Sequence, residues 1–187
     1  MKTLNPTLWR TCKMLAGQKR IQLLRQLYGH PGRNVSELGA AVGIKRACAS
    51  QELRRIQSRG LLKAKRQGLP LIYRMETDPQ VPSASPLLHA IRSALASRPP
   101  ERDLDMCRLA QGLAHERRIA IARVLLIAPR SAIDLNRLLR IAAPTLAKHL
   151  RILVHSGWAI RKGHLLYFKP PPHPLAQALA NLLKSAP

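Results

Sequence analysis

The spacing of apolar residues predicts a helical chain interrupted by short extended pieces. Over residues 21–28 they recur at three- and four-residue steps, the stripe of an amphipathic helix, and the glycines and proline of 29–32 end it. Val35 is expected to begin a short extended piece, with Ser36 as the N-cap of a two-turn helix. A third helix follows before Gly60, with an apolar face on one side and basic residues on the other.

Two short strands around a glycine-containing turn are expected after the third helix, over residues 61–74. A proline-rich connector at 78–85 cannot continue either element, because proline lacks a backbone N–H and fixes its own φ angle. The connector leads into a strongly apolar closing helix at 87–95.

This order of elements occurs twice in the chain. Residues 15–27 align with 113–125, and residues 37–60 align with 134–157. Self-similarity of this kind indicates a duplicated structural unit. The expected architecture is mainly α with small β hairpins, an α+β class, in two domains that comprise residues 1–97 and 98–187.

The charge of the chain points to a polyanionic partner. Its 187 residues include 32 Lys and Arg against 9 Asp and Glu, a formal net charge of +23, while 46% hydrophobic residues suffice for a core. Both halves are basic: +13 over residues 1–97 (17 basic, 4 acidic) and +10 over residues 98–187 (15 basic, 5 acidic). Such a field attracts phosphate, so nucleic acid is the expected partner and an anionic membrane surface the lesser alternative. Aromatic residues make up only 3%, too few to stack unpaired bases, which favours double-stranded DNA.

The cysteines and the apolar runs indicate a reducing compartment. Cys12, Cys48 and Cys107 are odd in number and far apart, which argues against a disulfide framework and a metal knuckle and favours buried thiols. No stretch has the pattern of a signal peptide or the ~20 apolar residues of a membrane span. A cytoplasmic, nucleoid-associated location without membrane contact is expected.

No constellation of catalytic residues is evident. The chain lacks a glycine-rich phosphate loop, the H-E-x-x-H and G-x-S-x-G motifs, and an evident pair of carboxylates for acid–base chemistry. His149 and His155 are six residues apart, so they do not share a helix face as an i, i+4 metal-ligand pair would. The sequence predicts a protein that is not an enzyme and has no metal or cofactor.

Three helices, the third of them basic, followed by a β hairpin form the plan of a winged helix-turn-helix. In the second half, residues 113–121 and 143–158 resemble the corresponding stretches of ArsR-type transcriptional repressors. The resemblance rests on a Thr, a basic residue, a His and a Leu on the third helix and a Gly before the hairpin. It implies two tandem winged helix-turn-helix domains in a sequence-specific DNA-binding regulator, a repressor, whose third helices enter the major groove.

The first half resembles the family more weakly. It has Cys48 where the second half has Thr145, and Glu52 where the second half has His149. The Cys-x-Cys pair of metal-sensing members does not occur ahead of the third helix. The second copy is therefore expected to dominate base reading, while the first mainly grips the backbone.

The candidate DNA contacts are polar and basic side chains of both third helices, which face bases, and of both hairpins, which face phosphates. Trp158 and Tyr167 are interpreted as core residues and not as stacking groups. The candidates are Lys45, Arg46, Ser50, Gln51, Arg54, Arg55, Lys63, Lys65, Arg66, Thr145, Lys148, His149, Arg151, Arg161, Lys162 and His164.

Two other functions stay open. One is a non-catalytic tandem winged-helix scaffold that binds protein, although a scaffold has no need of a +23 charge. The other is a replication-initiator type of DNA-binding protein, which the sequence does not separate from a regulator. The apolar closing helices at 87–95 and 175–183 are expected to pair as an internal pseudo-dimer, with a homodimer as the alternative.

Overall fold

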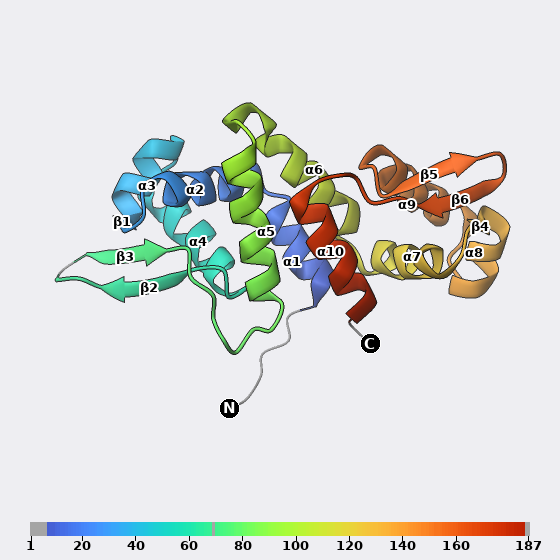
Figure 1. Cartoon of the computed structure of the whole chain (residues 1–187), viewed down its shortest axis with the longest axis horizontal. Coiled ribbons are helices and arrows are strands. Elements are labelled where there is room, and N and C mark those ends of the chain that lie inside the picture. Colours follow the sequence, from blue (N-terminus) through green and yellow to red (C-terminus); the bar gives the residue numbers. More distant parts are fainter. Residues whose placement is uncertain (1–6, 69, 186–187) are drawn as a thin grey trace. The chain divides into compact units, whose positions relative to one another are not determined.

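The computed structural model describes residues 7–68 and 70–185 and has an α+β architecture, mostly helical with two small antiparallel sheets (Figure 1). The chain forms two units. The first holds Thr7 and residues 17–107, and the second holds Leu8–Ala16 together with the described residues from Arg108 onward. The α+β class agrees with the sequence expectation. The division differs from the expected boundary after residue 97, because the N-terminal helix belongs to the second unit and residues 98–107 belong to the first.

The first unit consists of three helices, a small sheet and a closing helix. Its β3 lies between β1 and β2 and is antiparallel to both, so that Tyr73 is opposite Arg33 on one side and Ala64 on the other. The elements are α2 (Gln18–Gly29), β1 (Arg33–Asn34), α3 (Val35–Val42), α4 (Arg46–Gln57), β2 (Lys63–Arg66), β3 (Leu71–Arg74), α5 (Ala84–Ser97), the 3-10 helix η1 (Pro100–Arg102) and the start of α6 (Asp103–Leu113).

The second unit has the same order of elements, with an additional N-terminal helix. Its sheet has the order β4-β6-β5, the counterpart of β1-β3-β2. The elements are α1 (Leu8–Leu15), the end of α6, α7 (Glu116–Ile127), β4 (Arg130–Ser131), α8 (Ala132–Leu139), α9 (Ala143–His155), β5 (Ala159–Lys162), β6 (Leu165–Phe168) and α10 (Pro174–Ser185). The two-residue strands β1 and β4 extend each expected hairpin to three strands.

The short helices α3 and α8 begin with equivalent capping boxes. The Asn34 side chain accepts hydrogen bonds from the N–H groups of Ser36 and Glu37, while the Glu37 carboxylate accepts from the Asn34 N–H. Ser131 and Asp134 do the same at α8. The expectation that Ser36 caps α3 was wrong, and Val35 is already helical, because Asn34 supplies the acceptor two residues earlier.

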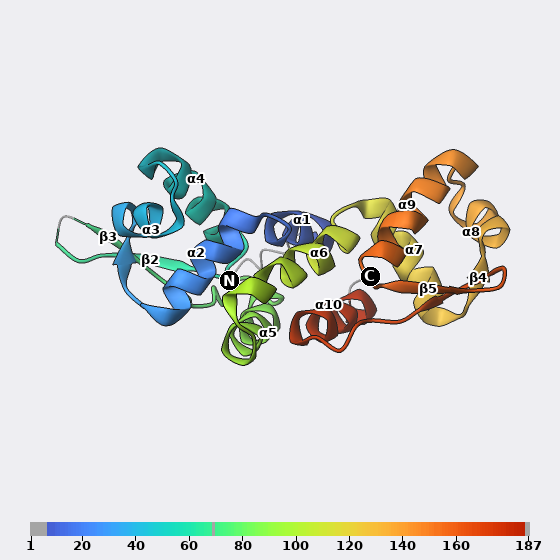
Figure 2. The same cartoon turned by 90° about the horizontal axis from the view of Figure 1, so that it is seen from above.

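The same backbone turn precedes each third helix. Gly43 ends α3 in the left-handed region with φ 67°, and Arg140 ends α8 with φ 50°. A left-handed residue at this point stops the helix and redirects the chain. The turn places α4 against α3 and α9 against α8 (Figure 2).

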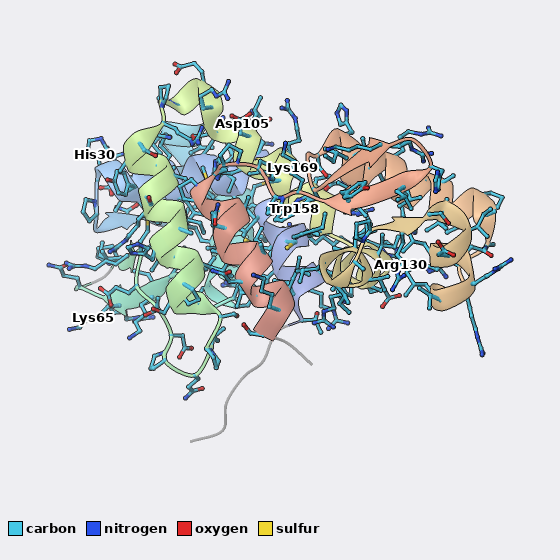
Figure 3. All side chains as sticks on the ribbon, turned by 45° about the vertical axis from the view of Figure 1, so that its right-hand side comes forward. His30, Lys65, Asp105, Arg130, Trp158 and Lys169 are labelled. Carbon is cyan, nitrogen blue, oxygen red and sulfur yellow. The ribbon has the colours of Figure 1, made fainter. Side chains whose placement is uncertain are left out.

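Trp158 lies at the centre of the second unit's core and is fully buried. Its ring Nε1 donates a hydrogen bond to the Leu109 carbonyl at 2.8 Å, and the ring stacks on Phe168 at 5.8 Å between centroids. Trp158 is labelled in Figure 3. Gly112 lies so close that a Cβ there would overlap the Trp158 ring and Ser156 Oγ. The core assignment of Trp158 is confirmed, and Tyr167 is half-buried.

Candidate nucleic-acid interface

Helix α4 is divided into a buried face and an exposed polar face. Ala49, Leu53 and Ile56 are completely buried at the four- and three-residue spacing of one helix face. The opposite face exposes Gln51 and Arg54 to solvent. Of the other predicted contacts on or beside this helix, Lys45, Arg46 and Arg55 are exposed and Ser50 is half-buried.

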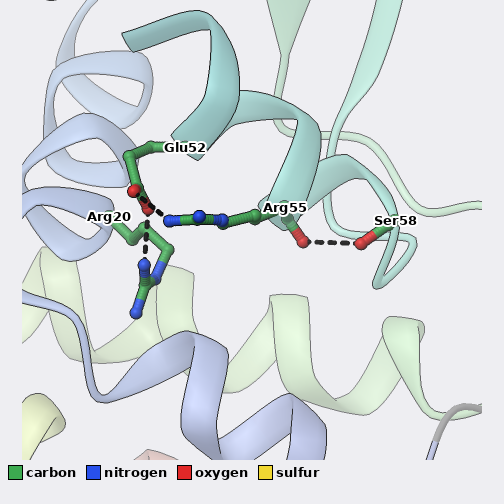
Figure 4. Close-up of polar contacts among 4 residues, drawn as sticks. All are labelled: Arg20, Glu52, Arg55 and Ser58. Carbon is green, nitrogen blue, oxygen red and sulfur yellow. Dashed lines mark hydrogen bonds and ion pairs between the residues drawn. The ribbon is translucent and has the colours of Figure 1, made fainter. Parts of the chain in front are cut away.

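The Glu52 carboxylate forms ion pairs within the first unit. Its carboxylate accepts from Arg20 of α2 at 2.5 Å and from Arg55 of its own helix at 2.5 Å (Figure 4). The side chains of Arg20 and Glu52 are only 16% and 18% exposed. The Arg55 carbonyl in turn accepts from Ser58 Oγ at 2.9 Å. Glu52 thus joins α4 to α2, and its charge is neutralised before any phosphate could approach.

Helix α9 has the same division, with one departure from the sequence expectation. Leu146, Leu150 and Leu153 face inward, and Lys148 and Arg151 are exposed. His149 shares the inner face and is only 6% exposed, so the expectation that it reads bases was wrong. The position falls three residues after one core leucine and one before the next, which places it on the packed side of the helix. Thr145 is half-buried.

The hairpin of the first unit has a basic outer face. Lys63 stands opposite Arg74 in the register of β2 and β3, and Lys65 follows on the same face opposite Ile72. These residues line an open hollow of about 630 Å³, together with Ala64, Arg66, Gln67 and Glu76. Like charges opposite each other destabilise a strand pair, so this face is better suited to binding an anion than to stabilising the sheet. Figure 3 shows Lys65 extending away from the ribbon.

The hairpin of the second unit exposes fewer charges, and they cluster at its turn. Arg161, Lys162 and His164 are all exposed around Gly163. The Lys162 ammonium lies 5.7 Å from the centre of the Tyr167 ring, a cation–π distance. The two hairpins therefore offer basic side chains at similar places, with the denser group on the first.

Two exposed side chains belong to these faces although the sequence analysis did not select them. His155 lies on α9 seven residues after Lys148, and Arg74 lies on β3 opposite Lys63. The seven-residue helical repeat applied from Lys148 would have found His155. Arg74 lies on the other strand of the hairpin, so only the register that pairs it with Lys63 identifies it.

The three cysteines differ in exposure. Cys12 and Cys107 are buried, and burial raises the pKa of the Cys12 thiol to about 12 and that of Cys107 to about 11. Cys48 is exposed on α4, so the expectation that all three thiols are buried was wrong for this one. It lies on the outer face of α4, one residue before Ala49 of the core.

A thiol reagent should therefore distinguish Cys48 from the other two. In the native protein we expect one fast-reacting thiol, because only the thiolate reacts and Cys12 and Cys107 are both protonated and enclosed. The measurement is time-resolved labelling with a chromogenic disulfide, with Cys48→Ser as the control that should abolish the fast phase. Two or three fast thiols in the native protein would contradict the packing described here.

Within residues 7–68 and 70–185, no group of three or more His, Cys, Asp or Glu side chains is placed to hold a metal ion. None of the helices described is long and apolar enough to cross a membrane. Comparison of the chain with protein-family models, with curated proteins and with solved structures finds no match.

Proposed function

We propose that this chain is a sequence-specific regulator of transcription that binds double-stranded DNA through two winged helix-turn-helix units. The observation that carries the proposal is the repeated placement of charge. In both units the third helix buries one face and exposes polar and basic side chains on the other, and a hairpin with exposed cations follows. A structural role alone does not require this pattern twice.

The dimensions of these elements suit duplex DNA. The major groove of B-DNA is about 12 Å wide, and an α-helix with its side chains is about 10–12 Å across. Gln51 and Arg54 on α4, and Lys148 and Arg151 on α9, are the side chains that would meet base edges. The lysines of the hairpins would then reach flanking phosphates, which fix register but carry no sequence information.

The acidic side chains do little to neutralise these faces, because many of them have internal partners. Asp103 forms a two-pronged ion pair with Arg25 at 2.7 Å for both contacts, and Asp105 pairs with Arg102 at 2.8 Å. Glu52 is held by Arg20 and Arg55 as described above. The positive potential of the helix and hairpin faces is therefore left for a partner.

The two units are proposed to make unequal contributions to DNA binding. Lys148 of α9 can donate to guanine, whereas Gln51 at the equivalent place on α4 favours adenine and carries no charge. The first hairpin carries the denser cations. The second unit would thus contribute more of the base reading, and the first more of the grip on the backbone.

Selection of bound sequences from random duplex DNA tests the proposal. The expected result is an enriched motif that contains two unlike half-sites, since the third helices differ in their exposed residues. Recovery of sequences without any enrichment would contradict sequence-specific regulation. Failure to retain any duplex would instead favour the scaffold alternative.

One chain carries both proposed binding units, so a second copy is not needed for a bipartite site. Light scattering on the free protein is expected to give a monomer of 20.8 kDa. A species of twice that mass that persists on dilution would contradict this expectation and favour a homodimer.

A further inference from the structure

Two histidines of the second unit, one of them on the inner face of α9, lie in contact. The ring centroids of His115 and His149 are 4.6 Å apart, and the rings are tilted by 50°. His149 is 6% exposed, and its Nδ1 has no hydrogen-bond partner among the described residues. In the first unit the equivalent of His149 is Glu52, which is held by arginines. The two third helices are therefore secured by different chemistry.

His115 also forms the N-cap of α7. Its Nδ1 accepts a hydrogen bond from the Arg117 N–H at 3.1 Å. A ring nitrogen that accepts carries no proton, and a protonated imidazole has no lone pair left to accept with. Protonation of His115 would thus break the cap and place a positive charge at the positive end of the helix.

The surroundings of this pair oppose a further positive charge. Arg118, itself buried, donates to the carbonyls of Gly112 at 2.8 Å and Gln111 at 2.9 Å and is therefore held in place. Burial contributes most to lowering the pKa of both imidazoles, and neighbouring cations lower it further, with His115 itself the next cause after burial for His149. Glu116 alone acts in the opposite direction and only on His115. The charged groups that face the pair are Lys13 of α1, Glu116, Arg117 and Arg118 of α7, and Lys148 of α9.

We propose that His115 and His149 are positioning residues that hold α9 in place only while both are uncharged, so that mild acid releases this helix and weakens DNA binding by the second unit. The consequence for DNA rests on the proposed function, whereas the loss of stability does not. In the first unit His30 and His89 are both exposed, so no similar pair operates there.

The direction of the pH effect depends on which protonation form of the histidines the folded and the unfolded chain favour. The unfolded chain takes up protons near the ordinary histidine pKa of about 6.5, while the folded unit resists them to lower pH. The contribution of the two neutral histidines to folding stability is therefore present above about pH 6.5 and is lost as the pH falls. Each histidine lowers the folding equilibrium constant by up to about tenfold between about pH 7.5 and pH 5.5, so the pair accounts for up to about 100-fold over this range.

Urea unfolding followed by tryptophan fluorescence tests the stability effect. Both tryptophans, Trp9 and Trp158, belong to the second unit, so their signal reports that unit alone. His115→Asn keeps a good N-cap but cannot take up a proton in this range, and it should remove up to about tenfold of the acid-induced loss. His149→Phe keeps the ring contact and should remove a similar share. His155→Asn alters an exposed histidine of the same helix and should show the same urea-unfolding midpoints as the unaltered protein.

DNA binding measured at about pH 7.5 and at about pH 5.5 gives a second readout, because the unaltered protein and the variant without the pair should respond in opposite directions. Acid raises the net positive charge of any protein, which by itself strengthens binding to phosphate. The unaltered protein should nevertheless bind its selected duplex more weakly at about pH 5.5 than at about pH 7.5. The variant with both His115→Asn and His149→Phe should bind more tightly at the lower pH.

The outcomes separate the two proposals. An unfolding midpoint that is the same at both pH values, or an acid-induced loss that is undiminished in both single variants, would overturn the role of the histidine pair. If no duplex binds at either pH, the proposed function fails, and the unfolding midpoints alone decide whether the second unit responds to protons.

Discussion

Replacing Lys148 and Arg151 together with alanine should weaken binding to the preferred duplex by about 2–6 kcal/mol, since each specific base contact contributes about 1–3 kcal/mol. Both side chains are exposed on the outer face of α9, away from its leucine core, so the fold should be unaffected. Fluorescence anisotropy on the selected site and on scrambled duplexes measures the effect, and binding should also become less selective.

The matched control for this experiment is the first hairpin. Replacing Lys65 and Arg66 with alanine should weaken binding to all duplexes alike, because phosphate contacts carry no sequence information. If Gln51→Ala changed the preferred sequence more than the Lys148 and Arg151 replacements did, the assignment of base reading to the second unit would be reversed.

Replacing Trp158 with alanine is expected to lower the free energy of unfolding of the second unit by about 3–5 kcal/mol. The side chain is fully buried, and its loss would leave a cavity beside Phe168 and remove the hydrogen bond to the Leu109 carbonyl. Urea unfolding followed by circular dichroism measures the change. Trp158→Phe should cost less, because a ring remains to fill the space.

Gly112→Ala provides a reciprocal test of the same contact. The added methyl group would overlap the Trp158 ring and Ser156 Oγ, so it should destabilise the unit by about 1–3 kcal/mol although alanine favours helix elsewhere. If Trp158→Ala cost less than about 1 kcal/mol, the close packing of α6 on this ring would be incorrect.

The order of elements could be predicted from the sequence because local periodicity determines it. The apolar positions of α4 recur at three- and four-residue steps. Because the chain contains two similar halves, most elements could be predicted twice, once from each half. The start of α3 was misplaced by a small margin, since Asn and Ser are both good N-caps and only the reciprocal bond with Glu37 selects Asn34.

His149 shows where a resemblance can mislead. Its residue type fits a base-reading role, but the spacing of Leu146, Leu150 and Leu153 places its side chain on the packed face. Helical periodicity alone would have excluded His149 from the candidate base-reading residues and would have included His155. Residue identity suggests what a side chain can do, while helical phase decides what it can reach.

Other features depend on contacts between distant residues and were therefore not predictable. The pairing of Glu52 with Arg20 joins residues 32 positions apart. The assignment of α1 to the second unit places residues 8–16 with a domain that begins about 90 positions later. No local pattern near Leu8 or Cys12 specifies such a partner.

The most direct test of the account is the salt dependence of binding to a duplex that contains the selected site. If the helices and hairpins of both units neutralise phosphates, a plot of log affinity against log salt concentration should have a slope on the order of −6 to −10. Binding to the corresponding single strands should be weaker, because they offer no major groove. A slope near zero, or equal or tighter binding to single strands, would contradict the proposal that this chain reads double-stranded DNA.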